Sequence, residues 1–154
     1  MTDAEWEARL EGCCARVLRG LVGVCGSLPD AEDALQEALV AALRVKDRDA
    51  IERLDGWLYV VALRALRRRR WRHRLERALD GLHLTQPGPG VQRVYAVELL
   101  RDLTPRQREV VVARFWLDLS YAEIAERFGI SVGTATSTVT RALERIRASA
   151  EDGP

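Results

Sequence analysis

The spacing of apolar residues is the feature that most constrains the fold of this chain. Several stretches keep a period of about 3.6 residues, and none keeps a convincing period of two. The valine- and isoleucine-rich runs are short, and glycine and proline mark the breaks between the periodic stretches. With 47% apolar residues in 154, the chain can fill the core of one ordinary domain or two small ones. We therefore predict an all-α fold.

A first helix is expected from Glu5 to about Val24, and it should end at Gly26-Ser27. Leu28-Pro29 would form the connection to a second helix. Asp30 is expected to be the N-cap of that helix. The acidic residues that follow would then load its first turn with the negative charge that the helix dipole favours.

The second helix has one apolar stripe and a separate polar face. The stripe recurs at helical spacing and consists of Leu35, Ala38, Leu39, Ala42 and Leu43. Asp33, Gln36 and Glu37 lie on another face. A charged connection from Val45 to Gly56 then leads to a third helix, which is expected to start near Trp57.

A net charge of only +1 hides a strong segregation of charge along the chain. Residues 1–63 carry 7 basic and 12 acidic side chains, and the residues after 77 carry 9 and 10. Between them, Arg64–Arg77 carry 8 basic residues and 1 acidic residue. Eight cations would repel one another without a polyanion nearby, so this block favours nucleic acid as its partner over a merely solvated helix end.

Proline and glycine place a domain boundary after the third helix. The stretch GLHLTQPGPGVQR at residues 81–93 holds two prolines and three glycines, which no helix would tolerate. We therefore predict two small helical domains, residues 1–80 and 94–154, joined by a flexible linker at residues 81–93.

The second domain carries the most specific local signals. Thr104-Pro105-Arg106-Gln107 combines a threonine N-cap, a proline at the first helical position and a glutamine that completes a capping box. Ser120-Tyr121-Ala122-Glu123 is a second capping box, and its helix is expected to run to about Phe128 and stop at Gly129. Ser131 can cap a further helix whose inner stripe is Ala135, Val139, Ala142, Leu143 and Ile146. Two such helices with a glycine-containing turn make a helix-turn-helix.

These motifs resemble a known family. LTPRQREVVVARFWLDLSYAEIAERFGISVGTATSTVTRALERIR resembles region 4 of the extracytoplasmic-function sigma factors of bacterial RNA polymerase. DAEDALQEALVAALR followed by GWLYVVALRALRRRR is similar to their region 2. Both motifs occur in the family's order and cover most of Asp30 to Ala148. The resemblance implies a helical bundle that reads and melts the promoter's minus-10 element, a helix-turn-helix that reads the minus-35 element, and no catalytic activity.

Melting a promoter needs cations that attract the backbone and aromatic rings that stack on unpaired bases. Trp57, Arg64, Arg68 and Trp71 fall on about one face of a continuous helix, and the other candidates that widen this face are Arg67, Arg69, Arg70 and Arg72. The resemblance also implies that the connection from Val45 to Gly56 holds a flipped base. Core packing is the alternative role for Trp57 and for Tyr59.

A recognition helix presents the solvent face near its N-terminus to base edges and phosphates. The candidates on that face are Ser131, Thr134, Thr136, Ser137, Thr140 and Arg141. Members of the family commonly carry a basic residue where this chain has Thr136, and each lost cation removes one counterion-release contribution to affinity. The alternative is that these hydroxyls only solvate the helix.

The resemblance implies that Asp33, Gln36 and Glu37 dock on the clamp helices of the polymerase's largest subunit. A basic groove on that partner would complement their charge. The alternative is an ordinary solvated face whose acidic residues favour the helix dipole.

Other classes of protein find little support in the sequence. Cys13, Cys14 and Cys25 are expected to be reduced and largely buried, and His73 and His83 are not at metal-ligand spacing. The longest apolar run, Trp57–Leu63, is too short to span a bilayer. No glycine-rich phosphate loop, nucleophile–base pair or convergent carboxylate cluster is present. We therefore expect no enzyme, cofactor, metal, membrane span or small-molecule substrate, and a cytoplasmic location because no secretory leader is evident.

The favoured hypothesis is a sigma factor that binds core RNA polymerase and promoter DNA, and the resemblance makes an anti-sigma factor a further candidate partner. One alternative is a free-standing helix-turn-helix regulator that needs no polymerase. Another is a degenerate sigma-like adaptor that binds polymerase without reading a minus-35 element, which the hydroxyl-rich recognition helix brings into consideration.

Overall fold

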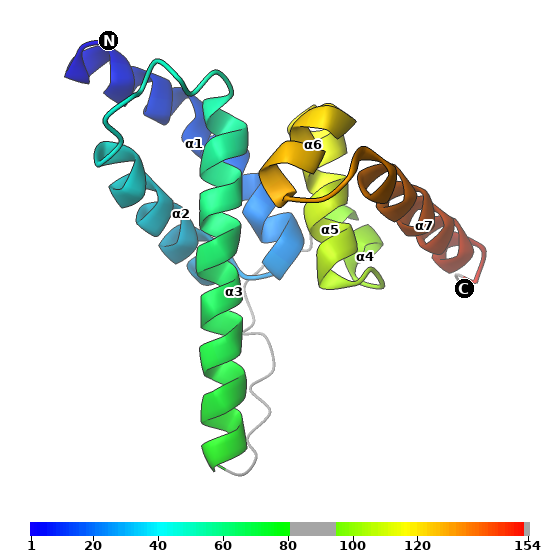
Figure 1. Cartoon of the computed structure of the whole chain (residues 1–154). Helices are drawn as coiled ribbons and strands as arrows, with labels where there is room; N and C mark the ends of the chain where they lie inside the picture. Colours follow the sequence, from blue (N-terminus) through cyan, green and yellow to red (C-terminus); the bar gives the residue numbers. More distant parts are fainter. Residues whose placement is uncertain (81–94, 153–154) are drawn as a thin grey trace.

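The computed structural model describes residues 1–80 and 95–152, and every regular element in these two ranges is a helix (Figure 1). The first range contains α1 (Asp3–Cys25), α2 (Leu28–Leu43) and α3 (Leu54–Asp80). The second contains α4 (Tyr95–Leu100), α5 (Pro105–Val111), the π-helical turn η1 (Val112–Trp116), α6 (Tyr121–Phe128) and α7 (Val132–Glu151). The all-α prediction is confirmed for these residues, and none of their helices is long and apolar enough to cross a membrane.

Local capping chemistry explains where α1 begins and ends. The Thr2 side chain accepts a hydrogen bond from the Glu5 N–H, and the Glu5 carboxylate accepts one from the Thr2 N–H, which completes a capping box. At the other end, Gly26 adopts the left-handed conformation with φ 68°, which glycine reaches without steric cost. The predicted end of the first helix at Gly26 is confirmed.

The start of the second helix was predicted incorrectly. Ser27, not Asp30, is the N-cap of α2, and its hydroxyl accepts the Asp30 N–H at 3.4 Å. Leu28 and Pro29 belong to the first helical turn, where the missing N–H of proline would have had no partner in any case. The third helix likewise begins at Leu54, before the expected Trp57.

α1, α2 and α3 pack against one another as a three-helix bundle. The largest fully buried side chains in its core are those of Trp6 and Tyr59. The Trp6 indole N–H donates to the carbonyl oxygen of Ala42 at 3.2 Å, which ties the start of α1 to the end of α2. Of the predicted apolar stripe of α2, Leu35, Ala38 and Ala42 are buried and Leu39 is half-buried. Leu43, the last residue of the helix, is exposed.

The C-terminal part forms the predicted helix-turn-helix from α6 and α7, supported by α5 and η1. Gly129 ends α6 with φ 64°, and Ser131 caps α7 by accepting the Thr134 N–H at 3.0 Å. Of the predicted inner stripe of α7, Ala135, Val139 and Ala142 are buried, and Leu143 and Ile146 are half-buried.

The two parts pack against each other and share one continuous apolar core. α1 contacts α4, α5 and η1, and α3 contacts α6. Gly20 of α1 is a point of close approach, since a Cβ atom there would lie 3.1 Å from side-chain atoms of both Trp116 and Val112. The sequence predicted two domains and a linker, but it did not indicate whether the domains pack together. The predicted linker at residues 81–93 lies outside the described residues.

Candidate nucleic-acid interface

The arginine block lies on one continuous helix, as its spacing predicted (Figure 1). The C-terminal part of α3 extends beyond α1 and α2 (Figure 1), and the side chains from Trp71 to Glu76 are exposed. The exposed members of the predicted set are Arg64, Arg67, Arg68, Trp71 and Arg72, whereas Trp57, Arg69 and Arg70 are half-buried. Trp71 is 69% exposed, which leaves a large ring available for stacking beside several cations.

The two aromatic residues at the start of α3 have different environments. Tyr59 is fully buried, and its hydroxyl donates to the carbonyl oxygen of Glu109 at 2.8 Å. Burial raises the pKa of Tyr59 well above its usual value. Tyr59 is therefore a core residue, whereas Trp57 is half-buried at the edge of a groove.

This groove has a volume of about 540 Å³ and lies beside the connection between α2 and α3. Its walls come from Ile51 of the connection, from Trp57 and Arg64 of α3, and from Glu126 and Arg127 of α6. An aromatic ring and a guanidinium group on one wall can stack on a base and attract its phosphate. The groove therefore lies at the place where the resemblance to sigma factors implied a flipped base.

Arg67 is neutralised within the chain by Glu109 of α5. Its Nε and Nη2 atoms lie 3.2 and 2.7 Å from the two carboxylate oxygens, which is a bidentate pair. The Glu109 side chain is only 4% exposed, and Arg106 supplies a second cation at 3.5 Å. The local charge count missed this partner because it lies 42 residues away along the chain.

The acidic face of α2 points toward the same arginine block. Asp33, Gln36 and Glu37 are all exposed, as predicted. Asp33 pairs with Arg69 at 2.7 Å, and Glu37 pairs with Arg68. Both pairs are largely solvated, and exposed pairs of this kind contribute about 0 to 1 kcal/mol each. The predicted polymerase-binding face therefore lies next to the predicted minus-10 surface, which sequence spacing did not indicate.

The recognition helix presents the predicted hydroxyls, but most of them are already hydrogen-bonded within α7. Ser131, Thr134, Thr136, Thr140 and Arg141 are exposed, and Ser137 is half-buried. The hydroxyls of Thr136, Ser137 and Thr140 donate to backbone carbonyl oxygens of the preceding turn at 2.9, 3.1 and 3.0 Å. Each such oxygen keeps its acceptor capacity for a donor on a base or a water molecule.

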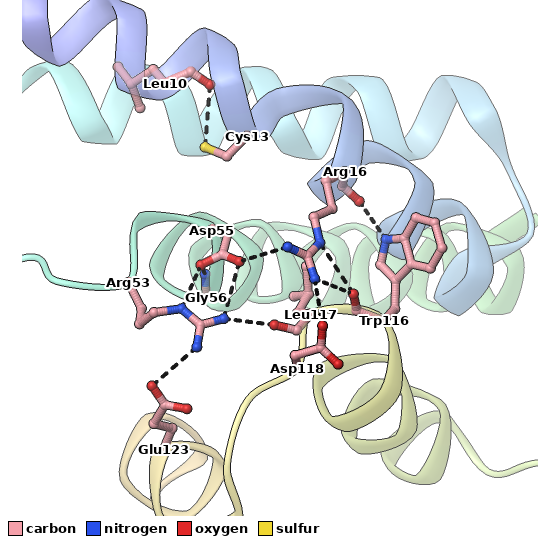
Figure 2. Close-up of polar contacts among 10 residues, drawn as sticks. All are labelled: Leu10, Cys13, Arg16, Arg53, Asp55, Gly56, Trp116, Leu117, Asp118 and Glu123. Carbon is pink, nitrogen blue, oxygen red and sulfur yellow. Dashed lines mark hydrogen bonds and ion pairs between the residues drawn. The ribbon is translucent and has the colours of Figure 1, made fainter.

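A polar network joins the two parts of the chain where α1 and α3 meet the turn after η1 (Figure 2). Arg16 donates to the carbonyl oxygen of Trp116 at 2.8 Å, and the Trp116 indole N–H donates to the carbonyl oxygen of Arg16 at 2.8 Å. Arg53 donates to the carbonyl oxygen of Leu117 at 2.7 Å and pairs with Glu123 at 3.4 Å. These contacts fix the turn to the N-terminal part.

Asp55 pairs with both arginines of this network. It pairs with Arg53 at 3.2 Å and with Arg16 at 3.9 Å, and it accepts the Gly56 N–H at 2.8 Å (Figure 2). Partial burial opposes ionisation of Asp55, but these hydrogen bonds and charges outweigh it and lower its pKa. The pairing is therefore complete at neutral pH and would be lost only at strongly acidic pH.

Cys13, Cys14 and Cys25 are free thiols, half-buried against the core rather than fully buried. Partial burial raises the pKa of all three, with that of Cys13 at about 11. The Cys13 Sγ lies 3.3 Å from the carbonyl oxygen of Leu10 (Figure 2). Because the thiolate is the reactive form, a raised pKa makes these thiols poor nucleophiles at neutral pH.

Four residues of the interface between the parts were not predicted from sequence: Arg16, Arg53, Glu109 and Trp116. Their partners lie between 42 and 102 residues away, beyond any helical period. A weak signal existed for Glu109, which occupies an inward position of an otherwise apolar stretch, EVVVA, in the helix that begins at Pro105.

Fold and site together define a class of protein: a helical nucleic-acid-binding protein with a basic aromatic helix in one part and a helix-turn-helix in the other. Comparison with known families gives the same assignment. Residues 13–76 match Sigma-70 region 2, and residues 93–146 match Sigma-70, region 4.

Relatives with similar sequences are RNA polymerase sigma factors. The RNA polymerase sigma-E factor of Streptomyces avermitilis is 37% identical over 125 residues, which cover 77% of this chain and 69% of the relative. That of Streptomyces antibioticus is 33% identical, over 85% of this chain and 76% of the relative. The ECF RNA polymerase sigma factor SigF of Caulobacter vibrioides is 37% identical, over 79% and 71%.

A solved structure has the same fold. The sigma factor RpoE of Bartonella quintana, in a co-crystal structure with the anti-sigma factor NepR, superposes with a TM-score of 0.73 over 97% of this chain and 99% of that chain, at 22% identity. The chain belongs to the extracytoplasmic-function (ECF) sigma factors of the sigma-70 family. It is thus a promoter-directing subunit that binds core RNA polymerase, and not an enzyme in its own right.

Proposed function

We propose that the two parts of this sigma factor divide promoter recognition between them. Residues 1–80 would bind and melt the minus-10 element through α3, and residues 94–154 would read the minus-35 element through α7. The observation that carries this proposal is the surface of α3, where exposed Arg64, Arg68 and Trp71 lie on one continuous helix. A surface that combines cations with an exposed ring suits single-stranded DNA, because phosphates and unstacked bases are bound together.

The groove beside Trp57 supports a second element of the proposal. An unpaired base could stack on the half-buried ring of Trp57 while Arg64 neutralises its phosphate. In this proposal Asp33, Gln36 and Glu37 of α2 dock on a basic surface of core polymerase, to which their charge is complementary.

Reversing two charges on α2 tests the polymerase contact. The variant Asp33→Lys/Glu37→Lys is expected to lose binding to core polymerase, because two attractive contacts become repulsive. The measurement is pull-down of core polymerase by the full chain. A matched control is Glu7→Lys/Glu11→Lys, which makes the same changes at two exposed positions of α1 with the same spacing.

The same variant separates this proposal from a free-standing regulator. If the chain is a regulator that needs no polymerase, the α2 variant should bind DNA as tightly as the unmodified chain, and its regulatory activity in cells should not depend on the α2 charges. If the α2 variant pulls down as much polymerase as the α1 control variant, α2 does not form the proposed contact.

A sigma-like adaptor that binds polymerase without reading a minus-35 element is a second candidate function. The observation that favours it is that the hydroxyls of Thr136, Ser137 and Thr140 already donate hydrogen bonds within α7. If α7 meets DNA, Thr136→Lys adds one phosphate contact and steepens the slope of log affinity against log salt by about one. A gel-shift series with duplex promoter DNA measures this slope. Ala148→Lys, which adds the same charge at the far end of α7, is the control. No change in slope for Thr136→Lys would favour the adaptor.

We further propose a cytoplasmic location, where core polymerase transcribes, and control by an anti-sigma protein. The support for such control is the similar fold of RpoE from Bartonella quintana, which was crystallised in complex with the anti-sigma factor NepR.

A further inference from the structure

The exposed side of α7 carries a row of three uncharged side chains. Val132, Thr136 and Thr140 recur every four residues, so they lie one above another along the helix. All three are exposed, and Val132 is 50% exposed although it is apolar. The next residue at this spacing is Glu144, an anion. The row therefore offers DNA hydroxyl and methyl groups, and no cation that could pair with guanine.

The hydrogen bonds of the two threonines decide what each can offer to a base. The Thr136 hydroxyl donates to the carbonyl oxygen of Val132 at 2.9 Å, and the Thr140 hydroxyl donates to that of Thr136 at 3.0 Å. A hydroxyl has one hydrogen, and a carbonyl oxygen can only accept, so the hydrogen of each threonine is already used. Each hydroxyl oxygen keeps a lone pair that can accept a further bond.

Base edges in the major groove differ in what they offer to such an oxygen. Adenine presents its N6 amino group and cytosine its N4 amino group, both of which donate, whereas guanine presents only the acceptors O6 and N7. A threonine of the row can accept from an amino group and keep its own bond within the helix. To donate to guanine it must first break that bond, so the guanine contact is weaker by about one hydrogen bond.

Val132 adds an apolar contact to the row. It is the first residue of α7, and its exposed side chain has no group that can hydrogen-bond to a base. Packing it against the methyl group of a thymine removes apolar surface of both partners from water. Cytosine presents no such methyl group in the groove. Val132 therefore favours thymine at the position that it contacts.

We propose that this row sets the base preference of the minus-35 contact. Val132 contacts a thymine methyl group, and Thr136 and Thr140 accept hydrogen bonds from the amino groups of adenine or cytosine, so the row selects against guanine. This inference deepens the proposed reading of the minus-35 element by α7, and it rests on that proposal.

Ser131 and Thr134, in and before the first turn of α7, are not part of this preference. Their hydroxyl oxygens lie 2.9 Å apart, and the Ser131 oxygen also accepts the Thr134 N–H at 3.0 Å. A bond between two hydroxyls uses only one of their two hydrogens, so one remains to donate. That hydrogen suits a phosphate oxygen, and phosphate contacts position a protein on DNA without selecting a base.

The test selects duplex DNA from a pool with a randomised segment, using the full chain bound to core polymerase, and compares the sequences that each variant enriches. Thr136→Val keeps the size of the side chain but removes the acceptor, so the base position read by Thr136 should lose its preference for adenine or cytosine. Because Thr136 is exposed, this change leaves the core intact.

Thr138→Val is the matched control. Thr138 makes the same kind of bond, to the carbonyl oxygen of Thr134 at 2.7 Å, but it is half-buried on another side of α7. Its enriched sequences should equal those of the unmodified chain.

Competition gel shifts with modified bases measure each contact. At the position that responds to Thr136→Val, replacing the base by its analogue without the amino group, purine or 2-pyrimidinone, should weaken binding of the unmodified chain about two- to tenfold. Thr136→Val should not respond to this replacement. At the position that responds to Val132→Ala, uracil in place of thymine should weaken binding about fourfold, the effect of one buried methyl group.

Two outcomes would overturn the inference while the role of α7 in DNA binding stands. One is guanine at the position that responds to Thr136→Val, since the hydroxyl would then donate. The other is identical enriched sequences for the unmodified chain, Thr136→Val and Thr140→Val, while Thr136→Lys steepens the slope of log affinity against log salt. If the slope of Thr136→Lys is unchanged too, α7 does not meet DNA, and the proposed reading of the minus-35 element fails together with this inference.

Discussion

Replacing Arg64, Arg68 and Arg72 together by alanine is expected to weaken binding of single-stranded DNA about a hundredfold near 0.1 M salt. The three side chains are exposed and recur every four residues along α3, so a DNA backbone that follows the helix can contact all of them. Each lost phosphate contact lowers the slope of log affinity against log salt by about 0.7 for a single strand, and three contacts together amount to about two logarithmic units at this salt concentration.

Fluorescence anisotropy over a salt series measures both the affinity and the slope. The matched control is the triple variant of Arg19, Arg44 and Arg101, three exposed arginines outside α3 whose replacement by alanine removes the same net charge. The control is expected to retain most of the affinity. If both triple variants weaken binding equally, only the net charge matters and α3 is no defined DNA surface.

Trp6→Ala is expected to lower the free energy of unfolding by about 3–5 kcal/mol, the usual cost of emptying a fully buried tryptophan site. The ring fills the space between α1 and the end of α2, and its N–H bond to Ala42 would also be lost. Urea denaturation followed by circular dichroism measures the change.

The variant Trp71→Ala is expected to have the opposite effects: little loss of stability and weaker DNA binding. Trp71 is 69% exposed, so its loss should change the free energy of unfolding by no more than about 0.5 kcal/mol. It should nevertheless weaken binding of single-stranded DNA by about 1–3 kcal/mol, the contribution of one stacked base. A large loss of stability in Trp71→Ala would mean that this ring packs in the core and is not available to DNA.

Sequence predicted well those features that are decided within a few residues. The capping boxes at Thr104 and Ser120, the left-handed glycine at 129 and the helix-turn-helix were all identified from short motifs. The error at Asp30 also had a local cause: a serine three residues earlier caps the helix first, with proline in its first turn. The placement of Arg64, Arg68 and Trp71 on one continuous helix followed from their spacing.

What sequence could not indicate are the contacts between the two parts. Arg67 is one of eight basic residues between 64 and 77, and nothing in that block shows that it alone meets a buried carboxylate from α5. The pairs of Arg68 and Arg69 with α2 depend on how two helices cross, which is set by side-chain packing and not by the pattern of either helix. Charge counted along the chain therefore overstates the positive potential of the folded surface.

Run-off transcription on fragments of the native genome, with purified core polymerase and this chain, tests the central claim most directly. We expect a limited set of defined transcripts that require the chain, that are lost with the Arg64/Arg68/Arg72 variant and that persist with the control triple variant. Binding of the chain to core polymerase without any chain-dependent transcript would contradict promoter recognition by α3 and α7.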